Sequence, residues 1–172
     1  VHYAHKGYSL YNVGFASGII ATVFVSVMKS FGMETEFRLL WDTGHDREML
    51  IVLAVLFLIM AAGALLLGGK NLLINYKTII RSTGISGTDY LKEVGGPATV
   101  FNMAVNGIFA TLFVLIVGGD LNGPTIGGIF TIVGFSTTGK HLRNIAPIMM
   151  GVVIASLTKD WDINEPSPML AL

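Results

Sequence analysis

Long uncharged stretches divide the chain, and short clusters of charged residues separate them. The stretches cover residues 7–28, 49–69, 94–119, 121–139 and 144–158. Four of them reach the ~18 residues that a membrane-spanning helix needs. Five such stretches in 172 residues argue against the buried helices of a soluble core. The pattern predicts an all-α fold, that of a polytopic helical membrane protein with spans at these five positions in one transmembrane domain, residues 1–172.

Composition agrees with this prediction. The chain is 52% hydrophobic and only 13% charged, whereas an ordinary soluble domain is about 25% charged. The 11 basic and 11 acidic residues cancel, so nothing favours nucleic acid as a partner, and a lipid bilayer is the expected one. The absence of cysteine excludes disulfides, thiolate zinc sites and a thiol nucleophile.

The charged segment 70–93 predicts a loop at the membrane surface. Apolar residues recur at roughly helical spacing over Asn71 to Arg81, which is typical of an amphipathic helix. If all five stretches cross the bilayer, one face holds seven basic residues and a net charge of +5, and the other holds four and a net charge of −5. The positive-inside rule then places loop 70–93 in the cytoplasm.

The fourth stretch is not an ordinary span. Asn122 is a suitable helix N-cap and Pro124 suits the first turn, which predicts a helix over Pro124 to Thr137. A helix of that length covers roughly 21 Å, less than a hydrocarbon core of ~30 Å. The segment is therefore expected to be short or re-entrant, with a kinked packing helix as the alternative. Short segments interrupted by glycine or proline are the best sequence indication of a transport site.

The first stretch resembles the fourth. A shift of 110 positions aligns Asn12 with Asn122 and Gly18 with Gly128. Three crossings separate the starts of the two copies, so a true repeat is inverted, as in many transporters. Chance similarity is the other interpretation.

Polar residues within the third stretch share one helix face: Thr99, Asn102 and Asn106 follow the spacing i, i+3, i+7. Such amides face a partner helix or water rather than lipid. They either bind helices together or line a polar path. The candidate pore-lining residues are Asn12, Thr99, Asn102, Asn106, Asn122 and Thr125, and the candidate broken-helix backbone is Gly14, Gly18, Gly123, Pro124, Gly127 and Gly128.

The sequence gives little support for a catalytic site or a metal site. The segment Gly134 to His141 nearly matches a phosphate-binding loop, but His141 replaces the essential hydroxyl. It also resembles, over six small residues, the filters of potassium-uptake channels. All four histidines are expected at the surface, and we expect no metal, no cofactor and no enzymatic activity.

Three segments carry a family resemblance: 7–18, with Gly-Tyr-Ser-Leu-Tyr-Asn-Val-Gly; 122–130, with Asn-Gly-Pro-Thr-Ile-Gly-Gly; and 160–168, with Asp-Trp-Asp-Ile-Asn-Glu-Pro. Together they resemble the bacterial membrane family filed as domain of unknown function 1576. The resemblance implies a multi-pass protein of the bacterial cytoplasmic (inner) membrane, without an assigned activity, in which the region can occur twice. The chain is accordingly interpreted as a fragment of a longer protein. The run Asn122 to Gly127 is also similar in style to the pore-helix motif of urea transporters, with Gly123 inserted before the proline.

Two functions are therefore expected. The first is a channel or facilitator for a small polar solute or ion. The alternative is a non-transporting membrane scaffold or partner-binding subunit, whose amides and glycines pack helices. The partners expected in either case are lipid, the remainder of the chain and a second copy of it.

The predicted orientation can be tested because the chain has no cysteine. Single cysteines replace Ser82 and Thr43, and intact cells are treated with a thiol reagent that does not cross the membrane. We expect Thr43→Cys to be labelled and Ser82→Cys to be protected. Labelling at position 82 but not at 43 would contradict the orientation.

Overall fold

The computed structural model describes residues 10–33, 41–84, 88–159 and 162–163. They form two compact units, residues 1–40 and 41–172, which we describe separately. The first contains helix α2 (Leu10–Ser30). Its exposed side chains from residue 19 onward include Ile20 at 61% and Phe24 at 63%.

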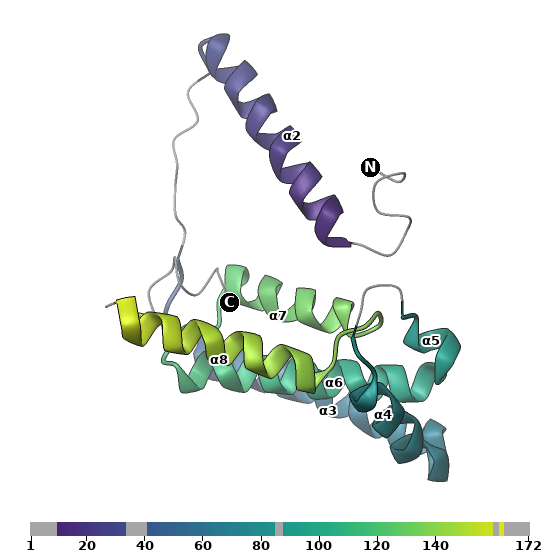
Figure 1. Ribbon diagram of the computed structural model, residues 1–172. Helices are drawn as coiled ribbons and strands as arrows, with labels where there is room; N and C mark the ends of the chain where they lie inside the picture. Colours follow the sequence, from purple (N-terminus) through teal and green to yellow (C-terminus); the bar gives the residue numbers. More distant parts are fainter. Residues whose placement is uncertain (1–9, 34–40, 85–87, 160–161, 164–172) are drawn as a thin grey trace. The chain divides into compact units, whose positions relative to one another are not determined.

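The second unit is built from helices joined by short loops (Figure 1). Their bounds are α3 (Asp46–Gly68), the 3-10 turn η1 (Gly69–Asn71), α4 (Leu72–Arg81), α5 (Tyr90–Glu93), α6 (Gly96–Ile116), α7 (Gly123–Phe135) and α8 (Leu142–Lys159). The described residues contain no β-strand, only an isolated bridge between Asp89 and Thr138. The predicted all-α fold is confirmed.

Helix α6 is the centre of this unit. It packs against α3, α4, α5, α7 and α8, and in Figure 1 the helices α3, α7 and α8 run alongside it. Small residues make the close packing possible, because Ala98, Ala104 and Ala110 are no more than 1% exposed. At Gly107 the two helices leave no room for a side chain, because a β-carbon there would lie 2.5 Å from the ring of the buried Phe57 on α3.

Apolar side chains cover much of the outer surface. On α3, Leu66 and Leu67 are 85% and 82% exposed, and on α6 Ile116 is 81% exposed. Among the described residues, two helices could cross a membrane by length and composition: residues 46–81, of which α3 is the apolar part, and α6. Exposed apolar surface of this extent indicates contact with lipid or with other protein, and the second and third predicted stretches coincide with these two helices.

The fourth and fifth stretches form shorter helices. Helix α7 has 13 residues and ends at Phe135, two residues before the predicted end, because Thr137 turns away and its carbonyl accepts a hydrogen bond from the Tyr90 N–H at 3.1 Å. Helix α7 is therefore roughly 20 Å long. Helix α8 contains Pro147 in its interior.

The contact between Gly107 and Phe57 generates a stability prediction. We expect Gly107→Ala to lower the free energy of unfolding by about 1–3 kcal/mol, since the added methyl group overpacks a closed contact. Gly128→Ala is the matched control, because a β-carbon at Gly128 of α7 meets no atom within 4 Å. The measurement is the thermal unfolding midpoint of each purified variant in detergent. Equal midpoints would show that α3 and α6 do not pack as described.

Candidate functional site

The turn between α7 and α8, residues 136–141, contacts two of the three polar side chains that the sequence analysis identified in α6. Asn102 and Asn106 lie one helical turn apart on α6, and both are fully buried. The Asn102 side-chain NH₂ donates to the Ser136 carbonyl at 2.9 Å and to the Lys140 carbonyl at 2.7 Å. The Asn106 NH₂ donates to the Ser136 hydroxyl oxygen at 2.7 Å. We call residues 136–141 the inner turn.

The hydrogen bonds of the inner turn orient both amides. Both partners of the Asn102 NH₂ are carbonyl oxygens, which only accept, so the nitrogen must face them. The Ser136 hydroxyl donates to the Ile132 carbonyl at 2.7 Å and is therefore free to accept from Asn106. The amide oxygens Oδ1 of Asn102 and Asn106 are buried and have no hydrogen-bond partner in the part of the chain that the structure describes.

A second loop, between α4 and α5, closes over the inner turn. The ring of His141 donates from Nε2 to the Ser82 carbonyl at 3.2 Å, because a carbonyl can only accept. The Ser82 hydroxyl in turn bonds to the Tyr90 hydroxyl at 2.7 Å. Gly84 lies against Asn144 and the Gly139 carbonyl, with no room for a β-carbon and with φ at +70°. The inner turn is thus held from α6 on one side and from the α4–α5 loop on the other.

The prediction of a surface role for His141 is wrong, because its side chain is 1% exposed. Burial lowers the pKa of His141, and the nearby charges of Arg143 and Lys140 lower it further, while the hydrogen bond to Ser82 opposes the shift. The ring is therefore neutral, with the proton on Nε2. Its Nδ1 atom is a third buried acceptor without a partner. His45 is exposed, as predicted, and bonds to Asp42, while His2 and His5 lie outside the described residues.

Asn122 and Thr125 lie at the opposite end of α7. Asn122 is the N-cap predicted from the sequence, and it forms a capping box with Thr125. Its NH₂ donates to the Asp42 carbonyl at 3.1 Å, and the Thr125 hydroxyl bonds to the Asp120 carbonyl at 2.7 Å. These side chains begin α7 and tie it to the segment that precedes α3. The 13 residues of α7 separate them from the inner turn by roughly 20 Å.

The remaining candidates fall elsewhere. Thr99 is buried, and its hydroxyl donates to the Gly95 carbonyl within α6 at 2.9 Å. Gly123, Gly127 and Gly128 have open space where a β-carbon would stand, and Pro124 lies in the first turn of α7. Asn12, Gly14 and Gly18 belong to α2, in the other unit, and the surroundings of their side chains lie outside the description. Among the pore-lining candidates of the second unit, Asn102 and Asn106 therefore meet at the inner turn, whereas Thr99, Asn122 and Thr125 do not.

Acidic residues gather at the N-terminal end of α7. The Trp41 indole donates to the Asp120 carboxylate at 2.8 Å, and the Asp46 carboxylate accepts from the Leu121 N–H at 2.6 Å. At the inner turn the neighbouring charges include Lys140 and Arg143, which act on His141. The two ends of α7 thus differ in charge. The N-terminal end carries acidic residues of the predicted −5 face, and the inner turn is next to basic residues of the predicted +5 face.

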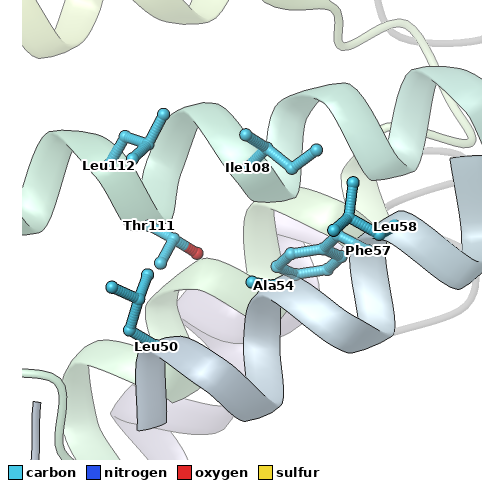
Figure 2. A pocket seen from close by; sticks show the side chains of 7 residues that line it. All are labelled: Leu50, Ala54, Phe57, Leu58, Ile108, Thr111 and Leu112. Atoms are coloured by element: carbon cyan, nitrogen blue, oxygen red, sulfur yellow. The ribbon is translucent and has the colours of Figure 1, made fainter. Parts of the chain in front are cut away.

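Two grooves open on the pair of helices α3 and α6, and both are apolar. Figure 2 shows the larger side chains of one groove: Leu50 and Phe57 of α3 lie opposite Ile108 and Leu112 of α6. Its volume is about 220 Å³. The Thr111 hydroxyl is the only polar side-chain group in its lining, and it donates to the Gly107 carbonyl at 2.8 Å. A second groove follows the same pair of helices toward Gly96 and Pro97. Neither groove offers a polar solute a binding partner.

No group of three or more metal-binding side chains occurs among the described residues. No curated protein matches the chain, and no solved structure does. The geometry defines an all-α protein. Its described part contains two helices that are apolar and long enough for a bilayer, and a buried polar turn lies against one of them. The chain belongs to the family described as "Protein of unknown function (DUF1576)", whose sequence profile matches residues 1–30 and 69–172. Residues 31–68, which include α3, lie outside the match. The family and the apolar helices are compatible with a membrane protein of unassigned function.

The hydrogen bond of His141 generates a pH prediction. Because the folded state lowers the pKa of His141 below 6.5, the folded chain binds this proton more weakly than the unfolded chain. The stability that the neutral ring contributes is complete above the unfolded pKa and is lost as the pH falls below about 6.5 toward the folded value. We expect the unfolding midpoint to fall between pH 7 and pH 5, and to fall less in His141→Gln.

The matched control is His45→Gln, whose ring is exposed near the other end of α7. This variant separates the loss of the buried ring of His141 from the loss of an exposed histidine. The same slope in His141→Gln and in the unaltered chain would show that His141 is not the group that titrates.

Proposed function

We propose that this chain is part of a multi-pass channel or facilitator for a small polar solute or ion in the bacterial cytoplasmic membrane. The observation that carries the proposal is the inner turn: non-helical backbone packed against the buried amides of Asn102 and Asn106 on α6. The proposed role is transport and not catalysis.

The position of the inner turn along α6 supports this role. Asn102 lies 14 residues before Ile116, the last residue of α6. It is therefore roughly 21 Å from the C-terminal end of a helix that is roughly 31 Å long. If α6 crosses a bilayer, the non-helical backbone at Ser136 that Asn102 binds lies within the depth of the membrane. Lipid cannot satisfy backbone N–H and C=O groups, so irregular backbone at that depth is tolerated only inside protein or beside a watery path. Transporters place such interrupted segments at their substrate sites.

The polarity of the inner turn also supports it. The three buried atoms without a partner in the described residues are Asn102 Oδ1, Asn106 Oδ1 and His141 Nδ1, and all three are acceptors. Leaving a buried acceptor unpaired costs about 1–3 kcal/mol. A passing cation or N–H donor would recover part of this energy. Asn102 and Asn106 are fully buried, so the proposal treats the described state as closed and requires the inner turn to move away from α6 for conduction.

A membrane scaffold is the second candidate, and one observation favours it. Every side-chain N–H donor of Asn102 and the capping groups of Asn122 are used to join helices to loops. Amides that only bind helices together would show this pattern. In a scaffold the partners would be the remainder of the chain, a second copy or another membrane protein, with no role for nucleic acid.

A flux measurement separates the two functions. The chain is reconstituted in liposomes, and the entry of glycerol, urea and K⁺ is compared with that of protein-free liposomes. Transport predicts a faster entry of at least one of these probes. We expect Asn106→Leu to change that rate roughly tenfold, as a change of about 1.4 kcal/mol in the barrier would. The control Asn75→Leu removes an amide that bonds to the Val94 carbonyl outside the inner turn, and it should leave the rate unchanged.

Unfolding midpoints of both variants establish that the proteins remain folded. No flux of any probe in folded protein would favour the scaffold. Equal fluxes in Asn106→Leu and the unaltered chain would contradict the role of the inner turn.

A further inference from the structure

Helix α4 presents an unusual outer face. On its inner side, Leu72 and Ile79 are each 1% exposed and pack in a cluster with Tyr90 and Ala98. On its outer side, Leu73 and Ile74 are each 65% exposed. The helix is therefore apolar on both sides, although only one side is covered by the rest of the unit.

Basic residues surround the exposed leucine and isoleucine. Lys77 and Arg81 lie four residues apart on the same helix face, and Lys77 follows Leu73 by one turn. Lys70 lies just before α4, and all three basic side chains are exposed. Helix α4 contains no acidic residue. The first acidic residues after α4 in the sequence are Asp89, whose carboxylate bonds to Lys92 at 3.2 Å, and Glu93, which is exposed. We call Lys70, Leu73, Ile74, Lys77 and Arg81 the basic face.

The basic face directly continues the apolar surface of α3. Leu66 and Leu67, the most exposed leucines of α3, lie in the last turn of that helix. Gly69 then breaks it with φ at +52° and ψ at −146°, so that α4 takes its own direction and packs on α6. If α3 crosses a bilayer, its apolar surface ends where the basic face begins, which is the level of the lipid headgroups.

We propose that the basic face binds the headgroups of anionic phospholipids, while Leu73 and Ile74 enter the outer part of the acyl region. An amphipathic helix with apolar residues between lysines and arginines has the composition of an interfacial helix, and long basic side chains can reach the headgroups while their stems cover apolar surface. The predicted cytoplasmic position of segment 70–93 agrees, because anionic lipids give the cytoplasmic leaflet its negative potential. The proposal rests on membrane insertion of the chain and does not depend on transport.

Lipid selectivity at α4 can be measured with a single reporter. The chain has no cysteine, so Leu73→Cys labelled with a bimane fluorophore reports on α4 alone. The labelled protein is placed in bilayers that contain brominated phosphatidylglycerol, which is anionic, or brominated phosphatidylcholine, which is neutral. The ratio of the two quenching constants gives the relative affinity for the two headgroups.

We expect phosphatidylglycerol to be preferred at this reporter. Near an anionic surface each lysine or arginine contributes about 1 kcal/mol, so Lys77→Gln and Arg81→Gln should each lower the preference about fivefold. High salt should lower it as well. Arg47→Gln is the matched charge control, since Arg47 is exposed near the opposite end of α3. Val52→Cys is the reporter control, because it lies on the exposed apolar surface of α3 and should show no headgroup preference.

Three results would overturn the proposal. Equal quenching by both lipids would show contact without selectivity for charge. A preference that survives Lys77→Gln with Arg81→Gln would place the anionic site elsewhere. Quenching by neither lipid, at Leu73→Cys and at the neighbouring reporter Ile74→Cys, would place α4 away from the bilayer and favour an acidic protein partner. If the folded protein showed no solute flux but kept its lipid preference, the proposed transport function would be wrong and the lipid-binding proposal would stand.

Discussion

The pair of hydrogen bonds from the Asn102 side chain to the Ser136 and Lys140 carbonyls organises the second half of the chain. These bonds join α6 to a segment more than 30 residues further along the chain. Their acceptors are backbone carbonyls that lie outside the helices. Because buried carbonyl groups without partners are costly, the inner turn can leave the helical path only where such donors are present. The length of α7 and the start of α8 both depend on this constraint.

The packing around α6 follows from the same arrangement. A helix that contacts several others needs small residues, since helix axes approach closely only where side chains are short. Ala110 packs in one cluster with side chains of α3 and α7, and Phe57 of α3 fills the space that Gly107 leaves. The amides occupy a face of the same helix without disturbing these contacts. One helix thus combines dry packing with a polar contact. Most of its buried residues are very small or hydrogen-bonded, and Phe113 and Val114 near its C-terminal end are the larger apolar ones.

Local features of the chain were predictable, and its long-range partnerships were not. The uncharged stretches predict α3 and α6, and the Asn122–Thr125 capping box depends on residues three apart, so each is visible in the sequence. The partner of Asn102 lies 34 positions away and that of His141 lies 59 positions away. No periodicity encodes such pairings, and a lone histidine carries no signal that it will be buried. For the same reason the spacing of Thr99, Asn102 and Asn106 predicted a shared face but not what that face contacts.

The inner turn is held from two sides, and this bears on how a transport function and a scaffold differ. Asn102 and Asn106 hold it from α6, while His141 and the N–H of Tyr90 link it to the α4–α5 loop. A turn that only had to stay in place would be stabilised by pairing every buried acceptor, yet three acceptors beside it are left unpaired. Unpaired acceptors raise the free energy of the closed state and so reduce the difference from a state in which the turn has moved and water or a solute can reach them. The same contacts that fix the turn therefore leave it less stable than full pairing would. The proposed transport function depends on this property, whereas the scaffold would not need it.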